Sequence, residues 1–229
     1  MKLALAEHFH SIQGEGYWTG TPMHFVRMAG CSVGRPGSLR PELTAVREGF
    51  FGVGATPTLS TGRAAWLCHR WDGTPFWCDT DFNKAEEVEL DELLNETWEN
   101  HICLTGGEPL MHAEAVTNLF IGCLKRGIKL HIETSGTIPI PQASWVTVSP
   151  KQGWLSETIE RANELKLLVD ENTSDLFPPE FLAHNRVYLS PINSVDKLNQ
   201  ASLARCLYLL KRRPNWKLSV QLHKYLGVR

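Results

Sequence analysis

The sequence has no hydrophobic run that approaches the roughly 20 residues needed for a membrane-spanning helix. It also lacks a strong excess of one charge, because the formal net charge is −2. Binding to nucleic acid or to an acidic membrane is therefore not expected. Glu7 and His8 come too early in the chain for the apolar core of a secretory signal peptide. We expect a cytoplasmic protein that binds neither nucleic acid nor membranes.

Internal repeats, low-complexity segments and a clear domain boundary are likewise missing from the sequence. The 229 residues are 42% hydrophobic and 21% charged, which is ordinary for a globular protein. A chain of this length can bury a substantial core. We expect a single domain that spans residues 1–229.

The chain has six cysteines, and the absence of a secretion signal favours reduced thiols or metal ligands over disulfides. Cys123 and Cys206 fall on apolar helical faces, and Cys103 lies inside an apolar strand, so we expect all three in the core. The other cysteines, Cys31 and Cys68 and Cys78, lie in or beside a segment without periodicity. These three are the candidates for chemistry.

Strand and helix patterns alternate along most of the chain, which indicates parallel β/α units. Strands are expected at Leu3–Ser11, His24–Ala29, His101–Leu104, Lys129–Thr134, Trp145–Ser149, Leu165–Val169, Arg186–Leu189 and Lys217–Leu222. Helical faces are expected at Leu90, Leu93, Leu94 and Trp98; at Val116, Leu119, Phe120, Cys123 and Leu124; in Thr158–Asn163; and at Leu203, Cys206, Leu207 and Leu210.

Residues 32–75 are rich in Gly, Pro, Ser and Thr and read as a long irregular insertion. A complete eight-unit barrel takes ~250 residues, so this α/β chain fits an incomplete (β/α) barrel better. Polar and glycine-rich residues repeatedly follow the expected strands. In β/α folds this end of the strands carries the active site.

The stretch Phe76-Trp77-Cys78-Asp79-Thr80-Asp81-Phe82 places a thiol beside hard oxygen donors. A thiolate binds soft metals, whereas hydroxyl and carboxylate oxygens suit magnesium. Three thiolates, from Cys31, Cys68 and Cys78, can hold three irons of a 4Fe–4S cluster and leave the fourth iron open. A zinc site that uses His69 is an alternative, as is a plain turn with a buried thiol.

Several motifs, in order along the chain, resemble those of the 7-carboxy-7-deazaguanine synthases, which are radical S-adenosylmethionine (SAM) enzymes of the queuosine (7-deazapurine) pathway. The resemblance covers nearly the whole chain except the insertion. The motifs are Gln13-Gly14-Glu15-Gly16, Phe25–Cys31, Trp77–Thr80, Thr105-Gly106-Gly107-Glu108-Pro109, Glu133–Thr137, Val148–Lys151, Glu160–Lys166 and Ser219–Tyr225.

The cysteine spacing departs from the common radical SAM pattern C-x3-C-x2-C. The first gap is far longer here, and Pro75 stands where C-x2-C would place a thiol. The resemblance implies that Cys31 and Cys78 bind the cluster, and Cys68 is the best remaining third ligand because it is the only other cysteine of the insertion.

The resemblance implies ring contraction of 6-carboxy-5,6,7,8-tetrahydropterin to 7-carboxy-7-deazaguanine with loss of ammonia. The reduced cluster would cleave SAM to a 5′-deoxyadenosyl radical, which abstracts a substrate hydrogen. An electron donor such as flavodoxin or ferredoxin and a homodimeric assembly are implied with it. A radical SAM activase of a glycyl-radical partner and a non-catalytic zinc-binding module are the competing functions.

The resemblance also assigns roles to residues. Arg27 would hold the substrate carboxylate with its planar fork, and Thr80 would bind Mg²⁺. The full substrate set is Ile12, Gln13, Gly14, Glu15, Arg27, Thr105, His223 and Arg229, the last through its main-chain carboxylate. The SAM set is Trp77, Cys78, Asp79, Gly107, Glu108, Ser149, Pro150, Lys151, Ser190, Pro191, Ile192 and Asn193.

Overall fold

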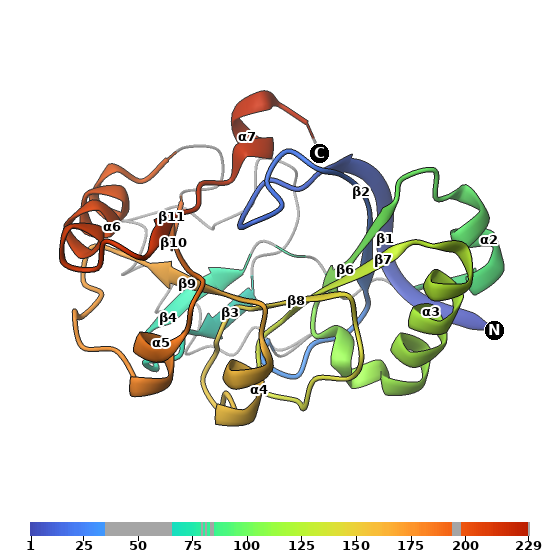
Figure 1. Cartoon of the computed structure of the whole chain (residues 1–229), viewed down its shortest axis with the longest axis horizontal. Coiled ribbons are helices and arrows are strands. Elements are labelled where there is room, and N and C mark those ends of the chain that lie inside the picture. Colours follow the sequence, from blue (N-terminus) through green and yellow to red (C-terminus); the bar gives the residue numbers. More distant parts are fainter. Residues whose placement is uncertain (35–65, 79, 81, 83–84, 194–197, 229) are drawn as a thin grey trace.

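The computed structural model describes residues 1–34, 66–78, 80, 82, 85–193 and 198–228, with the side chains of Trp66 and Trp77 left out. In this part of the chain, strands form a central sheet and helices lie around its outside (Figure 1). The termini are at separate places on the molecule, with the C-terminal helix α7 above the strands in this view.

The main sheet has nine strands in the order β11-β10-β9-β8-β7-β6-β2-β1-β5. The seven strands from β2 to β11 in this order run parallel, while β1 pairs antiparallel with both β2 and β5. The strand bounds are β1 Lys2–Ile12, β2 Pro22–Met28, β5 Glu86–Glu89, β6 His101–Gly106, β7 Lys129–Thr134, β8 Trp145–Val148, β9 Glu164–Val169, β10 Val187–Pro191 and β11 Lys217–Leu218. The predicted parallel β/α units are confirmed.

Helices connect most of the parallel strands and pack on one face of the sheet. Local sequence explains their ends: Asn199 caps α6 by accepting from the backbone N–H groups of Ala201 and Ser202, and Gly127 closes α3 in the left-handed conformation. The bounds are α2 Leu90–Glu96, the 3₁₀ helix η1 Pro109–His112, α3 Ala113–Arg126, α4 Ser156–Arg161, α5 Pro179–Ala183, α6 Gln200–Arg212 and α7 Leu222–Leu226.

Strand alternation divides the sheet into an apolar face and a polar face. On β7, Leu130 and Ile132 join the main core under the helices, whereas Glu133 lies on the other side. On β9, Leu165 and Leu167 face the core and Lys166 does not. Because successive side chains of a strand point to opposite faces, charged residues set between apolar ones collect on the face away from the helices.

The prediction that residues 32–75 are irregular is wrong for the C-terminal end of that range. Residues 66–78 form a two-stranded antiparallel hairpin, with strands β3 (Trp66–His69) and β4 (Pro75–Cys78). A turn at 70–74 joins them, closed by a bond from the backbone N–H of Arg70 to the carbonyl of Thr74. Strands of only four residues are too short to show a periodicity, which is why the sequence pattern missed them. Residues 35–65 lie outside the described part.

Some expected buried faces also need correction. Trp98 is 71% exposed, because α2 ends at Glu96 and Trp98 leaves the helical face. Leu124 and Leu207 are exposed as well, although Cys123 and Cys206 beside them are buried as predicted. The buried stripe of α6 runs through Ser202, Cys206 and Leu209, a helical spacing shifted from the predicted one. Finally, the expected strand Lys217–Leu222 is only two residues long, and Leu222 begins α7.

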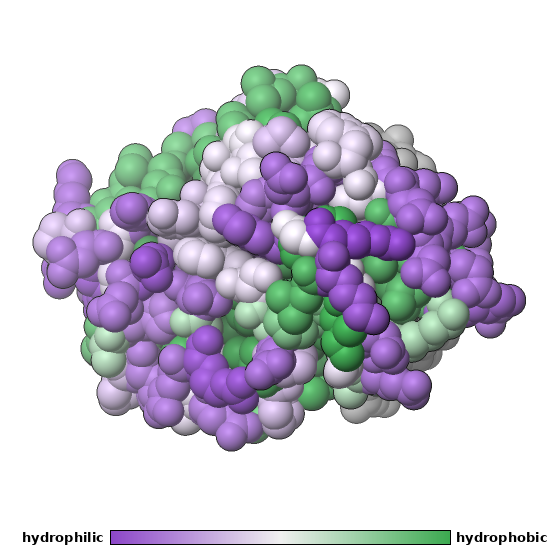
Figure 2. Space-filling view, turned by 45° about the vertical axis from the view of Figure 1, so that its right-hand side comes forward, coloured by the Kyte–Doolittle hydropathy of each residue, from purple (hydrophilic) through white to green (hydrophobic). Residues whose placement is uncertain are grey.

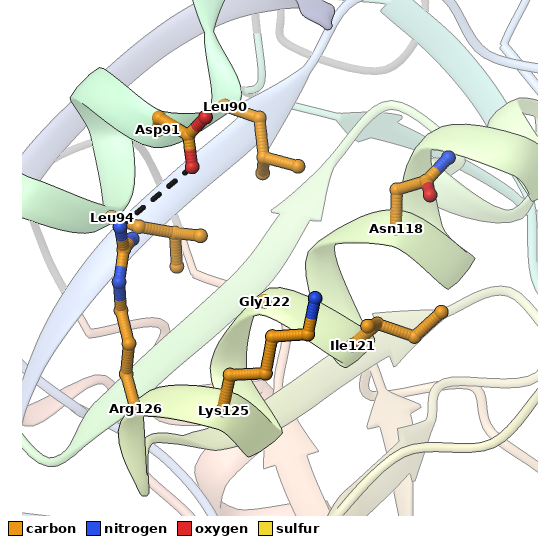
Figure 3. A pocket seen from close by; sticks show the side chains of 8 residues that line it. All are labelled: Leu90, Asp91, Leu94, Asn118, Ile121, Gly122, Lys125 and Arg126. Carbon is orange, nitrogen blue, oxygen red and sulfur yellow. Dashed lines mark ion pairs between the residues drawn. The ribbon is translucent and has the colours of Figure 1, made fainter.

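A pocket of about 210 Å³ lies between α2 and α3 (Figure 3). Gly122 lets the helices approach, since a Cβ there would lie 2.6 Å from Cδ1 of Leu94. Arg126 reaches Asp91 across the pocket at 3.7 Å. The pocket lining contains none of the predicted site residues.

The face in Figure 2 is mostly hydrophilic, with hydrophobic areas at its top, where Figure 1 places α7, and near its centre. Leu226 and Val228, within and after α7, are exposed. Among the described helices, none has the length and apolar character that crossing a membrane requires.

Two buried histidines make the fold sensitive to acid. Burial, with His101 beside it, lowers the pKa of His131 to about 3, and His101 Nδ1 lies 2.8 Å from His131 Nε2. Burial lowers the pKa of His24 to about 4, helped by His10 and His8. Both rings are thus neutral in the folded protein at pH values where they are charged in the unfolded chain.

We expect the free energy of unfolding to fall as the pH drops from about 6.5 toward 4, because the unfolded chain then binds more protons than the folded one. Each unit of pKa difference contributes about 1.4 kcal/mol. Urea unfolding of wild type and His131→Asn between pH 7 and pH 4.5 tests this. The variant should be less stable at pH 7 and should lose less stability on acidification, and an unchanged slope would contradict the expectation.

Candidate active site

Gln13, Thr105 and Glu133 meet on the polar face of the sheet. Gln13 directly follows β1 and donates from Nε2 to Oε1 of Glu133 at 3.1 Å. The Thr105 hydroxyl near the end of β6 donates to Oε2 of the same carboxylate, also at 3.1 Å. Gln13 and Thr105 were both predicted from the sequence, and the structure brings them together through Glu133, which was not.

Lys166 completes this cluster as its central cation. Its Nζ donates to Oε2 of Glu15 at 2.8 Å and lies 3.9 Å from Oε2 of Glu133. Burial alone would lower the pKa of Lys166, but Glu133 and Glu15 outweigh it and raise that pKa. Burial would raise the pKa of Glu133, and Lys166 with the Gln13 and Thr105 donors lowers it instead. Lys166 and Glu133 are therefore both charged at neutral pH.

Two packing contacts hold the loop that carries Gln13, Gly14 and Glu15. A Cβ on Gly14 would lie 2.0 Å from Nδ1 of His223, so this loop and α7 approach as closely as glycine allows. The backbone N–H of Leu222 also donates to the Gly14 carbonyl at 3.0 Å. The predicted substrate residues of the N-terminal loop and His223 are thus neighbours, although they lie at opposite ends of the sequence.

Glu164 secures the far side of the same loop. Its carboxylate accepts from the backbone N–H of Tyr17 at 2.9 Å and from the Thr147 hydroxyl at 2.8 Å. A Cβ on Gly16 would lie 2.3 Å from Oε1 of Glu164. Burial raises the pKa of Glu164. Its role is to hold the loop in place.

Arg27 on β2 lies beside Thr80. Its Nη1 donates to the Thr80 hydroxyl at 3.4 Å. Its Nε lies 3.1 Å from Oε1 of Glu7, an ion-pair distance without hydrogen-bond geometry. The guanidinium also lies 5.6 Å from the centre of the Phe9 ring. The two residues predicted for the substrate carboxylate and for Mg²⁺ are therefore in direct contact.

The three predicted cluster cysteines lie together. Cys68 and Cys78 are on one face of the β3–β4 hairpin and share a hydrogen bond, which raises the pKa of Cys68 together with burial and the nearby Cys31. Burial also raises the pKa of Cys31, whose sulfur accepts from the backbone N–H of Gly34 at 3.2 Å. A Cβ on Gly34 would lie 3.3 Å from the Cys68 sulfur.

The Gly106-Gly107-Glu108 turn packs against the loop of Cys31. A Cβ on Gly107 would lie 1.7 Å from the Gly30 carbonyl oxygen and 3.0 Å from Cβ of Cys31. The backbone N–H of Glu108 donates to the Gly30 carbonyl at 3.0 Å. Glycine is required here so that the turn and the cysteine loop can touch.

The Glu108 side chain is fully buried and used within the protein. Its carboxylate accepts from the backbone N–H of Leu110 and Ser135 and from the hydroxyls of Thr134 and Ser135. Glu108 thus braces β7 against the turn, and its predicted contact with SAM stays a prediction.

The remaining predicted SAM residues follow β8 and β10. Lys151 folds back so that Nζ donates to the carbonyl and the hydroxyl of Ser149, both at 2.7 Å. Burial lowers the pKa of Lys151 to about 8, with Lys166 acting in the same direction. Ser190 is buried, and its hydroxyl donates to Oε1 of Glu15 at 3.2 Å, which groups it with the predicted substrate residues.

The last members of the predicted set lie near these strand ends. The backbone N–H of Ile192 donates to the Val169 carbonyl at 2.8 Å, and Asn193 Nδ2 donates to Oε1 of Gln221 at 3.1 Å. Ile12 ends β1, Pro150 follows β8 and is buried, and Pro191 ends β10. Asp79, Asp81, Arg229 and the Trp77 side chain are outside the described residues.

Sequence reasoning missed Glu133, Lys166 and Glu7 as site residues. The signal was a charged residue inside a largely buried strand: Glu133 between Ile132 and Thr134 on β7, and Lys166 between Leu165 and Leu167 on β9. A strand buried on both faces seldom carries a charge unless the charge has a partner.

We expect Lys166→Met to lower the free energy of unfolding at pH 7 by about 3–5 kcal/mol, because the largely buried carboxylates of Glu15 and Glu133 lose their cation. Adding Glu15→Gln should restore part of the loss. Lys2→Met removes the exposed ion pair with Glu87 and, as the matched control, should leave stability nearly unchanged. Urea unfolding of the wild type, the two single variants and the double variant measures these changes in stability. Equal losses of stability in Lys166→Met and Lys2→Met would rule out a stabilising network around Lys166.

Comparisons with known proteins show which family the chain belongs to. No protein-family model matches the chain. The 7-carboxy-7-deazaguanine synthase of Bradyrhizobium diazoefficiens is 33% identical over 246 aligned positions, covering 100% of both chains. That of Escherichia coli is 30% identical over 270 positions with the same coverage, and that of Synechocystis is 29% identical over 98% of this chain and 93% of the relative.

A solved structure, QueE from Escherichia coli, is similar in fold, with a TM-score of 0.61 and 27% identity. The likeness covers 97% of this chain and 95% of that one. The motifs and the full-length similarity thus lead to the same family. The chain belongs to the 7-carboxy-7-deazaguanine synthases.

Proposed function

We propose that this protein is a radical SAM enzyme that converts 6-carboxy-5,6,7,8-tetrahydropterin into 7-carboxy-7-deazaguanine and ammonia in queuosine biosynthesis. The observation that carries the proposal is the meeting of Cys31, Cys68 and Cys78 beside a strand-end face with paired charges. The names of the relatives support it. The incomplete (β/α) barrel expected from the sequence is part of this proposal, supported by the run of parallel strands.

The three thiols fit a 4Fe–4S cluster by number, type and position. In the described part of the chain, no three His, Cys, Asp or Glu side chains converge to hold a single metal ion. A cluster does not need that, because each thiolate binds a different iron. When bound, the reduced cluster and SAM would supply the radical that starts the ring contraction.

A zinc site of Cys68, His69 and Cys78 fits the hairpin less well. Cys68 and His69 are consecutive residues of β3, so their side chains point to opposite faces. Cys78 lies on the face of Cys68. The hairpin therefore offers two thiols together and directs the imidazole away from them.

The substrate would bind at the charged face formed by Gln13, Glu15, Thr105, Glu133 and Lys166. The amide and amino groups of a pterin ring need both donors and acceptors, and this face provides carboxylates and an amide already held by hydrogen bonds. Such preorganised polar groups bind a polar ring without reorganising. A charged face of this kind suits a small polar ring better than the backbone of a glycyl-radical partner.

Arg27 would bind the substrate carboxylate, and Thr80 would bind Mg²⁺ beside it. The Thr80 hydroxyl already accepts from Arg27, so a cation at this oxygen would have a second cation next to it. The anionic carboxylate of the substrate is what offsets both charges. Mg²⁺ seldom takes all its ligands from the protein, so one hydroxyl beside the substrate is sufficient as an anchor. Homodimer formation and a flavodoxin or ferredoxin donor belong to the same proposal.

The decisive experiment is anaerobic turnover of 6-carboxytetrahydropterin by reconstituted protein with SAM, Mg²⁺ and a chemical reductant. We expect 7-carboxy-7-deazaguanine, detected by mass spectrometry. Thr80→Ala should keep SAM binding and lose most of the Mg²⁺ dependence, whereas Thr80→Ser should retain it. Protein with an intact cluster that cleaves SAM but forms no product from the pterin would refute the substrate assignment.

We expect Cys31→Ala, Cys68→Ala and Cys78→Ala each to lose the cluster, because each substitution leaves one iron without its protein ligand. Iron content and the visible absorbance of anaerobically reconstituted protein measure this. Cys123→Ala is the matched control, since that thiol is buried on α3, and it should bind iron like the wild type. A full-occupancy cluster in any of the first three variants would remove that cysteine from the ligand set.

We expect Arg27→Lys to weaken substrate binding about ten- to a hundredfold, the effect of losing a charge-assisted hydrogen bond of about 1.5–3 kcal/mol. Lysine keeps the charge but not the planar fork. SAM affinity, measured in parallel by calorimetry, should change little. Wild-type substrate affinity in the lysine variant would show that the fork does not bind the carboxylate.

A further inference from the structure

Cys68 and Cys78 do not have the C-x2-C spacing, yet the β3–β4 hairpin places them side by side. In its register Cys68 pairs with Phe76, and Trp66 pairs with Cys78. Cys68 and Cys78 are therefore diagonal neighbours on one face, which is within reach across an antiparallel pair. An isolated hairpin of this length is at best marginally stable in water, so the placement of both thiols depends on what holds the hairpin to the rest of the protein.

We propose that Arg70 is the positioning residue that fixes the hairpin, and with it Cys68 and Cys78, against the Cys31 loop. This inference rests on the proposed cluster site. Arg70 occupies the turn two residues after Cys68, and its side chain is 1% exposed. Among the largest side chains buried to this degree in the described part of the chain, it is the charged one.

The Arg70 guanidinium joins the hairpin to the end of β9. On the hairpin side, Nη2 donates to Asp72 Oδ2 at 3.0 Å. On the side of the sheet, Nη1 donates to the Thr173 hydroxyl at 2.5 Å and to the Leu168 carbonyl at 3.3 Å, and lies 3.2 Å from Oδ1 of Asp170. One rigid fork thus satisfies partners in both segments at once, which lysine cannot do.

Contacts on either side of Arg70 also attach the hairpin turn to the rest of the protein. Arg70 forms a backbone bridge with Lys151, and the backbone N–H of Gln152 donates to the His69 carbonyl at 3.2 Å. Trp71 packs on the aromatic rings of Phe177 and Phe181, with centroids 5.3 and 5.6 Å away. The hairpin turn is therefore anchored over the ends of β8 and β9, while the strands extend from it toward Cys31.

Because this anchor is polar, it restricts where the hairpin can lie. An apolar contact alone would allow the turn to slide, whereas a buried guanidinium must keep its acceptors, since losing one leaves an unpaired charge. Only one position of the hairpin brings Arg70 to both Asp170 and Thr173 on the other segment. The anchor thereby fixes the position of the thiols as well as the attachment of the hairpin.

The test uses cluster-free protein first, so that its readout does not depend on enzyme activity. Hydrogen exchange is followed by mass spectrometry in wild type, Arg70→Lys and Asp170→Asn. We expect amides of residues 66–78 to exchange about ten- to a hundredfold faster in the variants, the effect of losing a charge-assisted hydrogen bond. Peptides from β6 and β7 should keep their wild-type rates. Asp170→Asn keeps the side-chain shape and covers the case in which Arg70→Lys does not fold.

Arg205→Lys is the matched control, because Arg205 binds the same segment after β9 that accepts from Arg70. Its Nε donates to the Thr173 carbonyl at 2.6 Å, and its Nη2 donates to Asp175 at 3.4 Å; both acceptors lie outside the hairpin. This variant should leave exchange in residues 66–78 unchanged.

The second measurement is iron content and cluster absorbance after anaerobic reconstitution, which should fall in Arg70→Lys and not in Arg205→Lys. Wild-type exchange at 66–78 in both anchor variants, or equal acceleration throughout the protein, would overturn the inference, as would full iron content in Arg70→Lys. Wild-type protein that binds no iron would instead refute the proposed function, and with it any role of Arg70 toward a cluster.

Discussion

The polar half of the molecule depends on one interaction, the pairing of the Lys166 ammonium group with the carboxylates of Glu15 and Glu133. It joins β9, β7 and the loop after β1, which are distant in the sequence. A charge this deeply placed is stable only while its partners stay in position. The opposing carboxylates in turn hold Gln13, Thr105 and Ser190, so one cation orders side chains from most of the strand ends.

Glycine then determines how closely the surrounding loops approach this centre. Gly14 allows contact with His223, and Gly107 allows contact with Gly30 beside Cys31. Neither contact survives a Cβ without a shift of backbone or ring. The two sides of the site, the ionic face and the thiol cluster, are therefore attached to the same sheet through glycine contacts. A flexible connection at either point would separate the thiols from the polar face they are proposed to serve.

Much of this arrangement was predictable, and the failures have physical reasons. The strands at Lys129–Thr134 and Leu165–Val169 were found because apolar residues alternate with polar ones in the first and dominate the second. The hairpin at Trp66–Cys78 was missed because four-residue strands carry no periodicity and are held by contacts far away in sequence. Trp98 and Leu207 were misplaced because a helical pattern does not show where the helix ends or which of two overlapping stripes packs on the sheet.

The same distinction applies to the cysteines. Motifs around Cys31 and Cys78 predicted these two directly, Cys31 in the loop after β2 and Cys78 as the last residue of β4. Cys68 had no such motif, and its place beside Cys78 results from the pairing of β3 with β4 and from the burial of Arg70. A spacing motif such as C-x2-C encodes the distance between thiols in a short segment. In this chain the β3–β4 pairing and the proposed Arg70 anchor set that distance, so the sequence interval between Cys31 and Cys68 is free to grow as long as the hairpin turn keeps its acceptors at and just after the end of β9. A longer loop costs little free energy, whereas loss of the buried Arg70 guanidinium costs much more. The Arg70 contacts, rather than the number of residues between the cysteines, are therefore the constrained feature.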